Sequence, residues 1–161
     1  MLTKIYWLHA LKNSAKIGIM ARPRGNDWLE DEIINLKNQK VDTLVSLLER
    51  SEIYELGLIC EEEICLTKNL NFINFPINDR DIPEKGEALE QLLELLATKL
   101  TQGNSVVVHC RMGIGRSSIV AAAVLLKFNL KADDIIQNIC TVRGLRVPDT
   151  DQQLDWLKNR E

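Results

Sequence analysis

Residues 109–118 read HCRMGIGRSS and combine a nucleophile with groups that can bind an anion. The preceding stretch, Ser105 to His109, is β-branched and apolar, which is typical of a buried parallel strand. Cys110 would therefore stand at the carboxyl edge of a sheet, where α/β proteins bind ligands. A turn with two glycines can direct successive backbone N–H groups inward, and the start of a helix adds further donors. Such surroundings favour a thiolate, so we expect Cys110 to attack an anionic substrate.

Two side chains after this turn extend the predicted site. The guanidinium of Arg116 is planar and can bind two oxygens of a phosphate. The hydroxyl of Ser117 can donate a hydrogen bond to the cysteine sulfur and stabilise it as a leaving group. A glycine turn with an incidental buried cysteine would also fit the pattern. The predicted phosphate-binding residues are Arg111, Met112, Gly113, Ile114, Gly115 and Arg116.

The stretch HCRMGIGRSS resembles the pattern HC-x-x-G-x-x-R-[ST] of the cysteine-dependent protein tyrosine phosphatase superfamily at every fixed position. The resemblance implies a cysteinyl-phosphate intermediate and calls for no metal or cofactor. It also implies that His109 supports the thiolate through hydrogen bonds. The segment FPINDRDIP at 75–83 resembles the F-P-I-x-D-x-x-x-P segment of dual-specificity and kinase-associated phosphatases, which implies Asp79 as the general acid. Asp81 is the alternative acid. Either aspartate could instead belong to a polar turn that caps the following helix, a role that suits Asp81 better.

Two further correspondences are less specific. Residues 142–153 resemble the family's R-x-x-R…T-x-x-Q stretch, which implies that Gln153 orients the hydrolytic water. Thr150 and Gln153 also have the spacing of a helix capping box. Arg22 lies in a segment similar to the family's N-terminal loop, where it would touch the substrate or remain a solvated charge.

Strands and helices alternate along the chain, which predicts a single α/β domain over residues 1–161, with a mainly parallel sheet flanked by helices. An Asp27–Glu30 capping box is expected to open the first helix. A leucine stripe from Leu89 to Leu100 marks the clearest helix, which follows Pro83 and ends at Gly103. The expected strands are Lys4–Leu8, Lys16–Met20, Thr43–Leu47, Asn71–Phe75 and Ser105–His109, and the other helices Asp27–Lys40, Glu52–Thr67, Ser117–Phe128, Asp133–Arg143 and Thr150–Arg160.

Composition limits the partners. The net charge of −3 over 161 residues does not favour nucleic-acid binding. The longest apolar run, Ile119–Leu126, is too short for a bilayer span of roughly 20 residues, and no secretory signal is recognised. The four cysteines do not form a disulfide framework, which indicates a reducing cytoplasm. We expect a cytoplasmic monomer that binds neither membrane nor nucleic acid.

The combined expectation is a phosphatase acting on phosphotyrosine proteins, with phosphoserine and phosphothreonine as further substrates. The first alternative is a phosphatase of a phosphoinositide or nucleotide. Phosphoinositide phosphatases of this superfamily commonly carry lysines within the loop, where this chain has Met112 and Ile114. The second alternative is a phosphate-binding module without catalysis.

Overall fold

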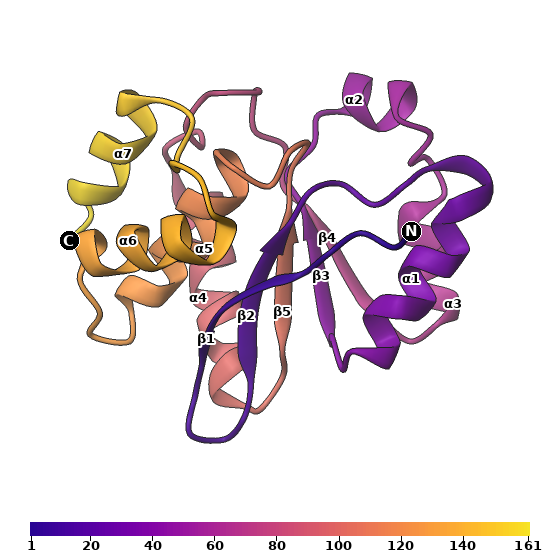
Figure 1. The fold of residues 1–161 in the computed structure, drawn as a ribbon, viewed down its shortest axis with the longest axis horizontal. Helices are drawn as coiled ribbons and strands as arrows, with labels where there is room; N and C mark the ends of the chain where they lie inside the picture. The colour runs from indigo at the N-terminus through magenta and orange to yellow at the C-terminus, as the bar shows by residue number, and fades with distance from the viewer.

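The strand that precedes Cys110 lies at the centre of the sheet. The computed structural model describes residues 1–161, and its five strands lie in the order β1-β2-β5-β3-β4 (Figure 1). Strand β1 pairs with β2 in antiparallel fashion, and the other three pairings are parallel. The strands are β1 (Tyr6–Ala10), β2 (Lys16–Met20), β3 (Thr43–Ser46), β4 (Asn71–Asn74) and β5 (Val106–His109).

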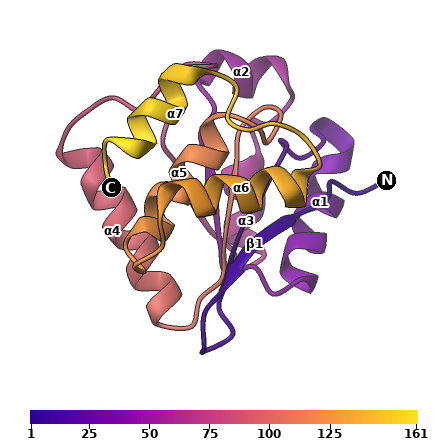
Figure 2. The same cartoon turned by 60° about the vertical axis from the view of Figure 1, so that its left-hand side comes forward.

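Helices cover both faces of this sheet. Helices α1 (Leu29–Asn38) and α3 (Glu61–Thr67) lie on one face. The opposite face carries four helices, of which α6 and α7 come forward in Figure 2. The short α2 (Arg50–Glu55) stands at the carboxyl end of the parallel strands (Figure 1). The four helices of the opposite face are α4 (Glu87–Thr101), α5 (Arg116–Leu126), α6 (Ala132–Arg143) and α7 (Asp151–Lys158).

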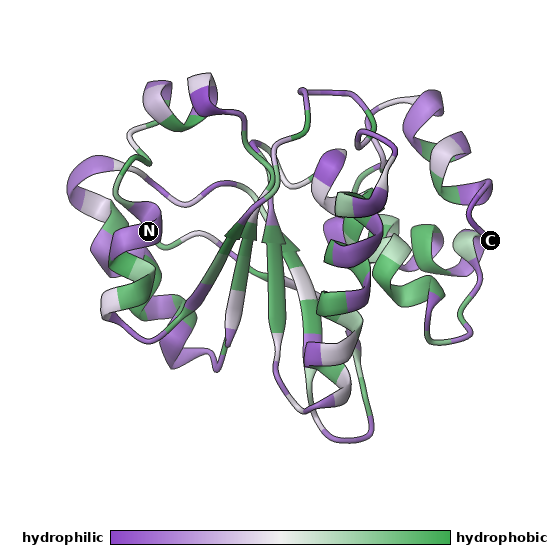
Figure 3. Ribbon diagram, turned by 180° about the vertical axis from the view of Figure 1, so that it is seen from behind, coloured by the Kyte–Doolittle hydropathy of each residue, from purple (hydrophilic) through white to green (hydrophobic).

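The two faces of the sheet bury cores of different size. The α4–α7 side holds a cluster of 27 buried apolar residues, and the α1–α3 side holds one of 12. Helix α5 lies within the larger cluster, and all its residues from Arg116 to Leu125 are buried. The inner strands of the sheet are coloured mostly hydrophobic in Figure 3. Burial on both faces explains why β5 reads as a continuous apolar run rather than an alternating one. No helix is both long and apolar enough to cross a bilayer.

The predicted α/β architecture is correct, but three local predictions are wrong. The helix expected over Glu52–Thr67 is two helices, α2 and α3, because Gly57 adopts a φ of +71° in the turn between them. The Asp27 capping box does not form. Helix α1 starts at Leu29 after a 3-10 turn over Asn26–Trp28, and no side chain caps the N-terminus of α1. The first strand runs over residues 6–10 instead of 4–8 because its pairing with β2 begins at Tyr6.

Candidate active site

The loop over residues 110–115 joins β5 to α5 and packs against the segment that follows β2. A Cβ on Gly113 would lie 2.6 Å from the Met20 carbonyl carbon, and Gly113 has a φ of +69°. Both the close approach and the left-handed backbone require glycine here. The backbone N–H of Arg22 donates to the carbonyl of Arg111 at 3.2 Å. This tight packing fixes the loop at the end of the central strand.

Arg143 at the end of α6 holds two carbonyls of the loop. Its Nε donates to the Gly113 carbonyl at 2.9 Å and its Nη2 to the Met112 carbonyl at 3.3 Å. The guanidinium also lies over the Tyr6 ring, 4.2 Å from the centroid. In a trans peptide the N–H points opposite to the C=O. The N–H groups of Gly113 and Ile114 therefore point away from Arg143, as an anion-binding loop requires.

Cys110 and Ser117 meet at the base of the loop. The Cys110 sulfur lies 3.2 Å from the Ser117 hydroxyl oxygen, within hydrogen-bond distance. Both residues are buried. The hydroxyl can donate to the sulfur once the thiol has lost its proton. The structure thus brings together the predicted nucleophile and the predicted donor to its sulfur.

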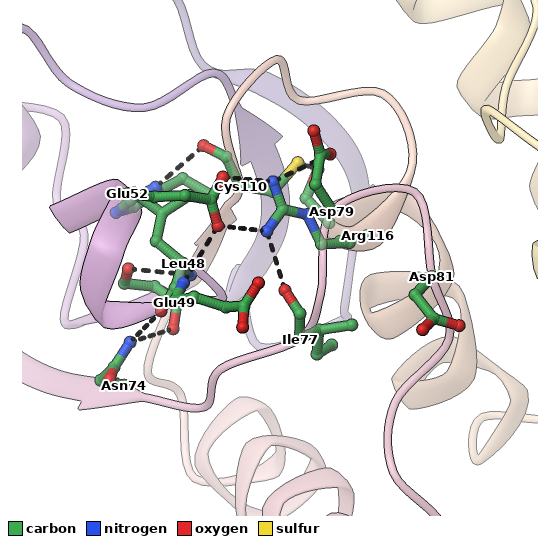
Figure 4. A network of polar contacts seen from close by, with 12 residues as sticks. Leu48, Glu49, Glu52, Asn74, Ile77, Asp79, Asp81, Cys110 and Arg116 are labelled. Atoms are coloured by element: carbon green, nitrogen blue, oxygen red, sulfur yellow. Dashed lines mark hydrogen bonds and ion pairs between the residues drawn. The ribbon is translucent and has the colours of Figure 1, made fainter. Parts of the chain in front are cut away.

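Arg116 is buried in a network of acceptors (Figure 4). Its Nη1 donates to Glu52 Oε1 and to the Ile77 carbonyl, both at 2.8 Å, and its Nη2 donates to Glu52 Oε2 at 2.9 Å. Nη2 also lies 3.1 Å from Asp79 Oδ1. Burial by itself would lower the pKa of Arg116, but the Glu52 hydrogen bond and the charges of Cys110, Glu52 and Asp79 raise it. The guanidinium is therefore a fixed cation beside the nucleophile.

Glu52 is the buried counter-charge of Arg116. Burial acts to raise the pKa of Glu52, but hydrogen bonds from Arg116 and the Glu49 backbone, with the charges of Arg116 and Arg111, lower it. Glu52 also completes a capping box with Glu49 at the start of α2. Asn74 supports this end of the fold by donating to the carbonyls of Ser46 and Leu48.

The two candidate acids occupy different positions on the loop after β4. Asp79 lies beside Arg116 and near the Cys110 sulfur, and its side chain is 56% exposed (Figure 4). Asp81 points away from this group, and its Oδ1 accepts a hydrogen bond from the Ile82 N–H at 2.8 Å. The expected cap on the following helix is not formed, since α4 begins after Gly86 without any side-chain cap. The geometry favours Asp79 as the acid.

His109 lies behind the loop and is fully buried. Its Nδ1 lies 3.2 Å from the backbone carbonyl of Cys110, and its Nε2 lies 2.7 Å from Glu61 Oε2 on α3. The ring thus contacts the Cys110 backbone, and its support of the nucleophile stays a prediction. No hydrogen bond joins the ring to the sulfur.

The remaining predicted residues lie at the edges of this group. Gln153 is buried and forms the capping box with Thr150, while its Nε2 donates to the Asp81 carbonyl at 3.0 Å. Its Oε1 would be 2.9 Å from a Cβ on Gly115, so the amide lies over the loop and its proposed role with water stays a prediction. The Arg22 guanidinium donates to the neighbouring Pro23 carbonyl at 3.3 Å, and its contact with a substrate stays a prediction.

Three residues of this site were not predicted from the sequence: Glu52, Glu61 and Arg143. Each contacts the 109–116 segment from a distant part of the chain, with separations of 64, 48 and 30 residues for the bonds to Arg116, His109 and Gly113. One signal did exist, because a buried arginine almost always has a counter-charge. The stretch 49–63 contains six glutamates, so the sequence could not indicate which one.

The arrangement of the whole chain matches a solved cysteine phosphatase. A crystal structure of kinase-associated phosphatase, in which serine replaces the catalytic-site cysteine, superposes with a TM-score of 0.87. The match covers 98% of this chain and 93% of that chain at 21% identity. The fold is therefore the cysteine-phosphatase fold that the sequence predicted, an α/β sheet with a loop-borne cysteine at its carboxyl edge.

Sequence comparison identifies the family. A family model described as "Polymorphic toxin system, DSP-PTPase phosphatase" matches residues 18–129, and the chain belongs to this family. Protein tyrosine phosphatase type IVA 3 of Mus musculus is 29% identical over 111 residues, which are 65% of this chain and 64% of that protein. Cyclin-dependent kinase inhibitor 3 of Rattus norvegicus is 34% identical over 84 residues, 51% of this chain and 39% of that protein. The chain thus spans less than two thirds of these relatives.

Proposed function

We propose that the chain hydrolyses phosphate monoesters through a cysteinyl-phosphate intermediate. The observation that carries this proposal is the meeting of four side chains at the end of β5. The Cys110 sulfur lies 3.2 Å from the Ser117 hydroxyl, and the buried Arg116 lies 3.1 Å from Asp79. A nucleophile, a fixed cation and a partly exposed carboxyl group are the parts that phosphoryl transfer needs.

The reaction divides into two steps. First, the Cys110 thiolate forms a sulfur–phosphorus bond while the ester oxygen leaves with a proton from Asp79. The loop N–H groups and Arg116 bind the equatorial oxygens of the phosphoryl group. A water molecule then attacks phosphorus, Asp79 accepts its proton, and the sulfur leaves as a thiolate stabilised by Ser117. Gln153, over the loop, is proposed to orient this water.

The proposed substrate is a phosphorylated protein, chiefly at tyrosine, bound by the enzyme as a monomer. The names of the similar proteins support this class, because tyrosine-protein phosphatases are prominent among them. Met112 and Ile114 give the loop no lysines for additional phosphates of an inositol ring. All four cysteines are free thiols, which suits the reducing cytoplasm that we propose as its location.

Turnover of an aryl phosphate and of phosphotyrosine peptides tests the proposal. Cys110→Ser should abolish hydrolysis while retaining peptide binding, since the anion-binding loop and Arg116 remain. Arg116→Lys should weaken both, because an ammonium cannot reproduce the planar two-point contact. Arg146→Lys is the matched control, since the Arg146 side chain is 83% exposed and pairs only with the surface residue Asp151. Hydrolysis by Cys110→Ser at the parent rate would contradict the mechanism.

A faster rate on phosphoinositides than on phosphopeptides would contradict the substrate class. Binding of phosphopeptides without any hydrolysis by the parent protein would instead support the non-catalytic alternative.

A further inference from the structure

A carboxyl group and an imidazole form a buried pair directly beneath the nucleophile. Glu61 is the first residue of α3 and His109 the last of β5, and their side chains are 2% and 0% exposed. Nε2 of the ring lies 2.7 Å from Oε2 of the carboxyl group. No other ion pair involves Glu61. Buried charges are rare without such a partner.

The hydrogen-bond partners of His109 determine where its protons lie. The carbonyl of Cys110 can only accept, so Nδ1 must be the donor in the 3.2 Å contact. When Glu61 is ionised, its oxygens also only accept, and Nε2 then donates to it. The ring then carries both protons and a positive charge. The second carboxyl oxygen of Glu61 is buried without a hydrogen bond, so the contact with His109 is the one polar contact of this carboxyl group.

We propose that Glu61 is a positioning residue that keeps His109 doubly protonated, so that the ring holds the Cys110 backbone and favours the thiolate. The effect on turnover rests on the proposed phosphatase function. The effect on the protonation of the Cys110 thiol does not rest on that function. Glu61 forms no hydrogen bond with the Cys110 sulfur, and it acts through the ring of His109.

The other titratable groups near the pair do not replace this interaction. Cys65 lies one turn along α3, and burial, with the charges of Glu61 and Glu62, raises its thiol pKa to about 12. It therefore stays neutral at physiological pH. The strand neighbours of His109 in the sheet, Met20 on β2 and Ser46 on β3, are uncharged.

Two further charged groups lie on elements around the pair, and both have their own partners. Glu32 on α1, which packs against α3, accepts hydrogen bonds from the Thr3 and Arg24 backbones. Arg116, across the loop, is held by Glu52. Glu61 is thus the one acidic side chain within hydrogen-bond distance of the His109 ring.

Alkylation of Cys110 by iodoacetamide, followed by mass spectrometry from pH 4.5 to 9, measures the thiolate without any turnover. Glu61→Gln retains the shape and can donate its amide N–H to a neutral ring, so it removes the charge and keeps a hydrogen bond. We expect its rate curve to move to higher pH, with alkylation about tenfold slower at pH 5 and an unchanged plateau. Glu63→Gln is the matched control, because Glu63 is exposed on the same helix and should leave the curve in place.

A Glu61→Gln curve that coincides with the parent curve would overturn the proposal. A second test uses His109→Asn, in which Glu61→Gln should cause no further shift if Glu61 acts through the ring. A full additional shift in that background would assign Glu61 a direct effect and contradict the inference. Phosphatase activity is measured on the same samples, so a parent protein without turnover would refute the proposed function while the alkylation result still stands.

The parent protein provides a third test that requires no variant to fold. Nitrogen-15 NMR of the histidine rings has only two residues to assign, His9 and His109. We expect bound protons on both nitrogens of His109 at pH 7. A bare Nε2 would place the shared proton on Glu61, leave the pair without charges, and overturn the proposal.

Discussion

Replacing Glu52 by glutamine tests whether Arg116 depends on a buried counter-charge. The pair consists of two hydrogen bonds of 2.8 and 2.9 Å between side chains that are 1% and 9% exposed. Glutamine keeps one acceptor oxygen and directs its NH2 group at a guanidinium, which can only donate. It also preserves the capping box at the start of α2, because glutamine serves there as well as glutamate. The change therefore isolates the ion pair.

The expected loss of stability follows from the burial of the pair. Removing one partner of a buried ion pair costs about 3–5 kcal/mol. The retained acceptor recovers part of this, so Glu52→Gln should lower the free energy of unfolding by about 2–4 kcal/mol at pH 7. Glu55→Gln is the control, since Glu55 lies on the same helix and its 3.4 Å pair with Arg111 is exposed. An exposed pair of this kind is worth about 0–1 kcal/mol.

The difference in the free energy of unfolding between the parent and Glu52→Gln should also depend on pH. The pKa of Glu52 is lowered from its usual 4.5 in the folded chain. Stability from this group is therefore complete above about pH 4.5 and is lost as the pH falls through the lower folded-state value. Urea unfolding at pH 7 and at pH 3 should show the parent and Glu52→Gln converging in acid. The catalytic efficiency should fall by on the order of 10–100-fold, because the guanidinium is no longer held in place.

Two outcomes would refute this reasoning. A Glu52→Gln variant within 1 kcal/mol of the parent at pH 7, a loss no larger than an exposed pair gives, would show that the pair is not a net source of stability. Full activity combined with a large loss of stability would show that Arg116 is positioned by the Ile77 carbonyl without Glu52.

Further predictions concern the acid and the loop. Asp79→Asn should slow hydrolysis of phenyl phosphate by about 10²–10⁴-fold and that of a low-pKa aryl phosphate far less. Asp81→Asn should show a small effect that is independent of the leaving group. A series of substrates with different leaving groups checks both variants, and the reverse pattern would exchange the roles of the two aspartates. Gly113→Ala should cost more than the roughly 1–2 kcal/mol of its left-handed backbone, because its Cβ would meet the Met20 backbone at 2.6 Å. Gly103→Ala, with a φ of +93° and open space, should show the backbone cost alone in urea unfolding, and equal losses would refute the packing argument.

The fold was predictable from the sequence wherever a local pattern determines it. The apolar run before His109, the glycines of the loop and the leucine stripe of α4 each reflect burial or backbone geometry within a short segment. The break between α2 and α3 was missed because Gly57 adopts its left-handed conformation in a tight turn packed against Gly25. A single glycine between two leucines does not reveal such a contact.

The site residues were likewise predictable only where one short segment contains them. Cys110, Ser117 and Arg116 lie within eight residues of one another, so their meeting follows from one turn and one helix start. Glu52 and Glu61 reach that segment only through the tertiary fold. Their identity depends on which side of α2 and α3 faces the loop, and neither short helix has a pattern that specifies it.

The segment that carries Asp79 is anchored on both sides of that residue. On one side the Ile77 carbonyl binds Arg116 at 2.8 Å, and on the other the Asp81 carbonyl binds Gln153 on α7 at 3.0 Å. A wide swing of this segment would break both bonds and expose a buried arginine and a buried glutamine. Any movement of Asp79, the proposed acid, is therefore restricted to residues 78–80, of which Arg80 has a φ of +61°. Catalysis here would rely on a short pivot about a fixed frame rather than on the closing of a flap.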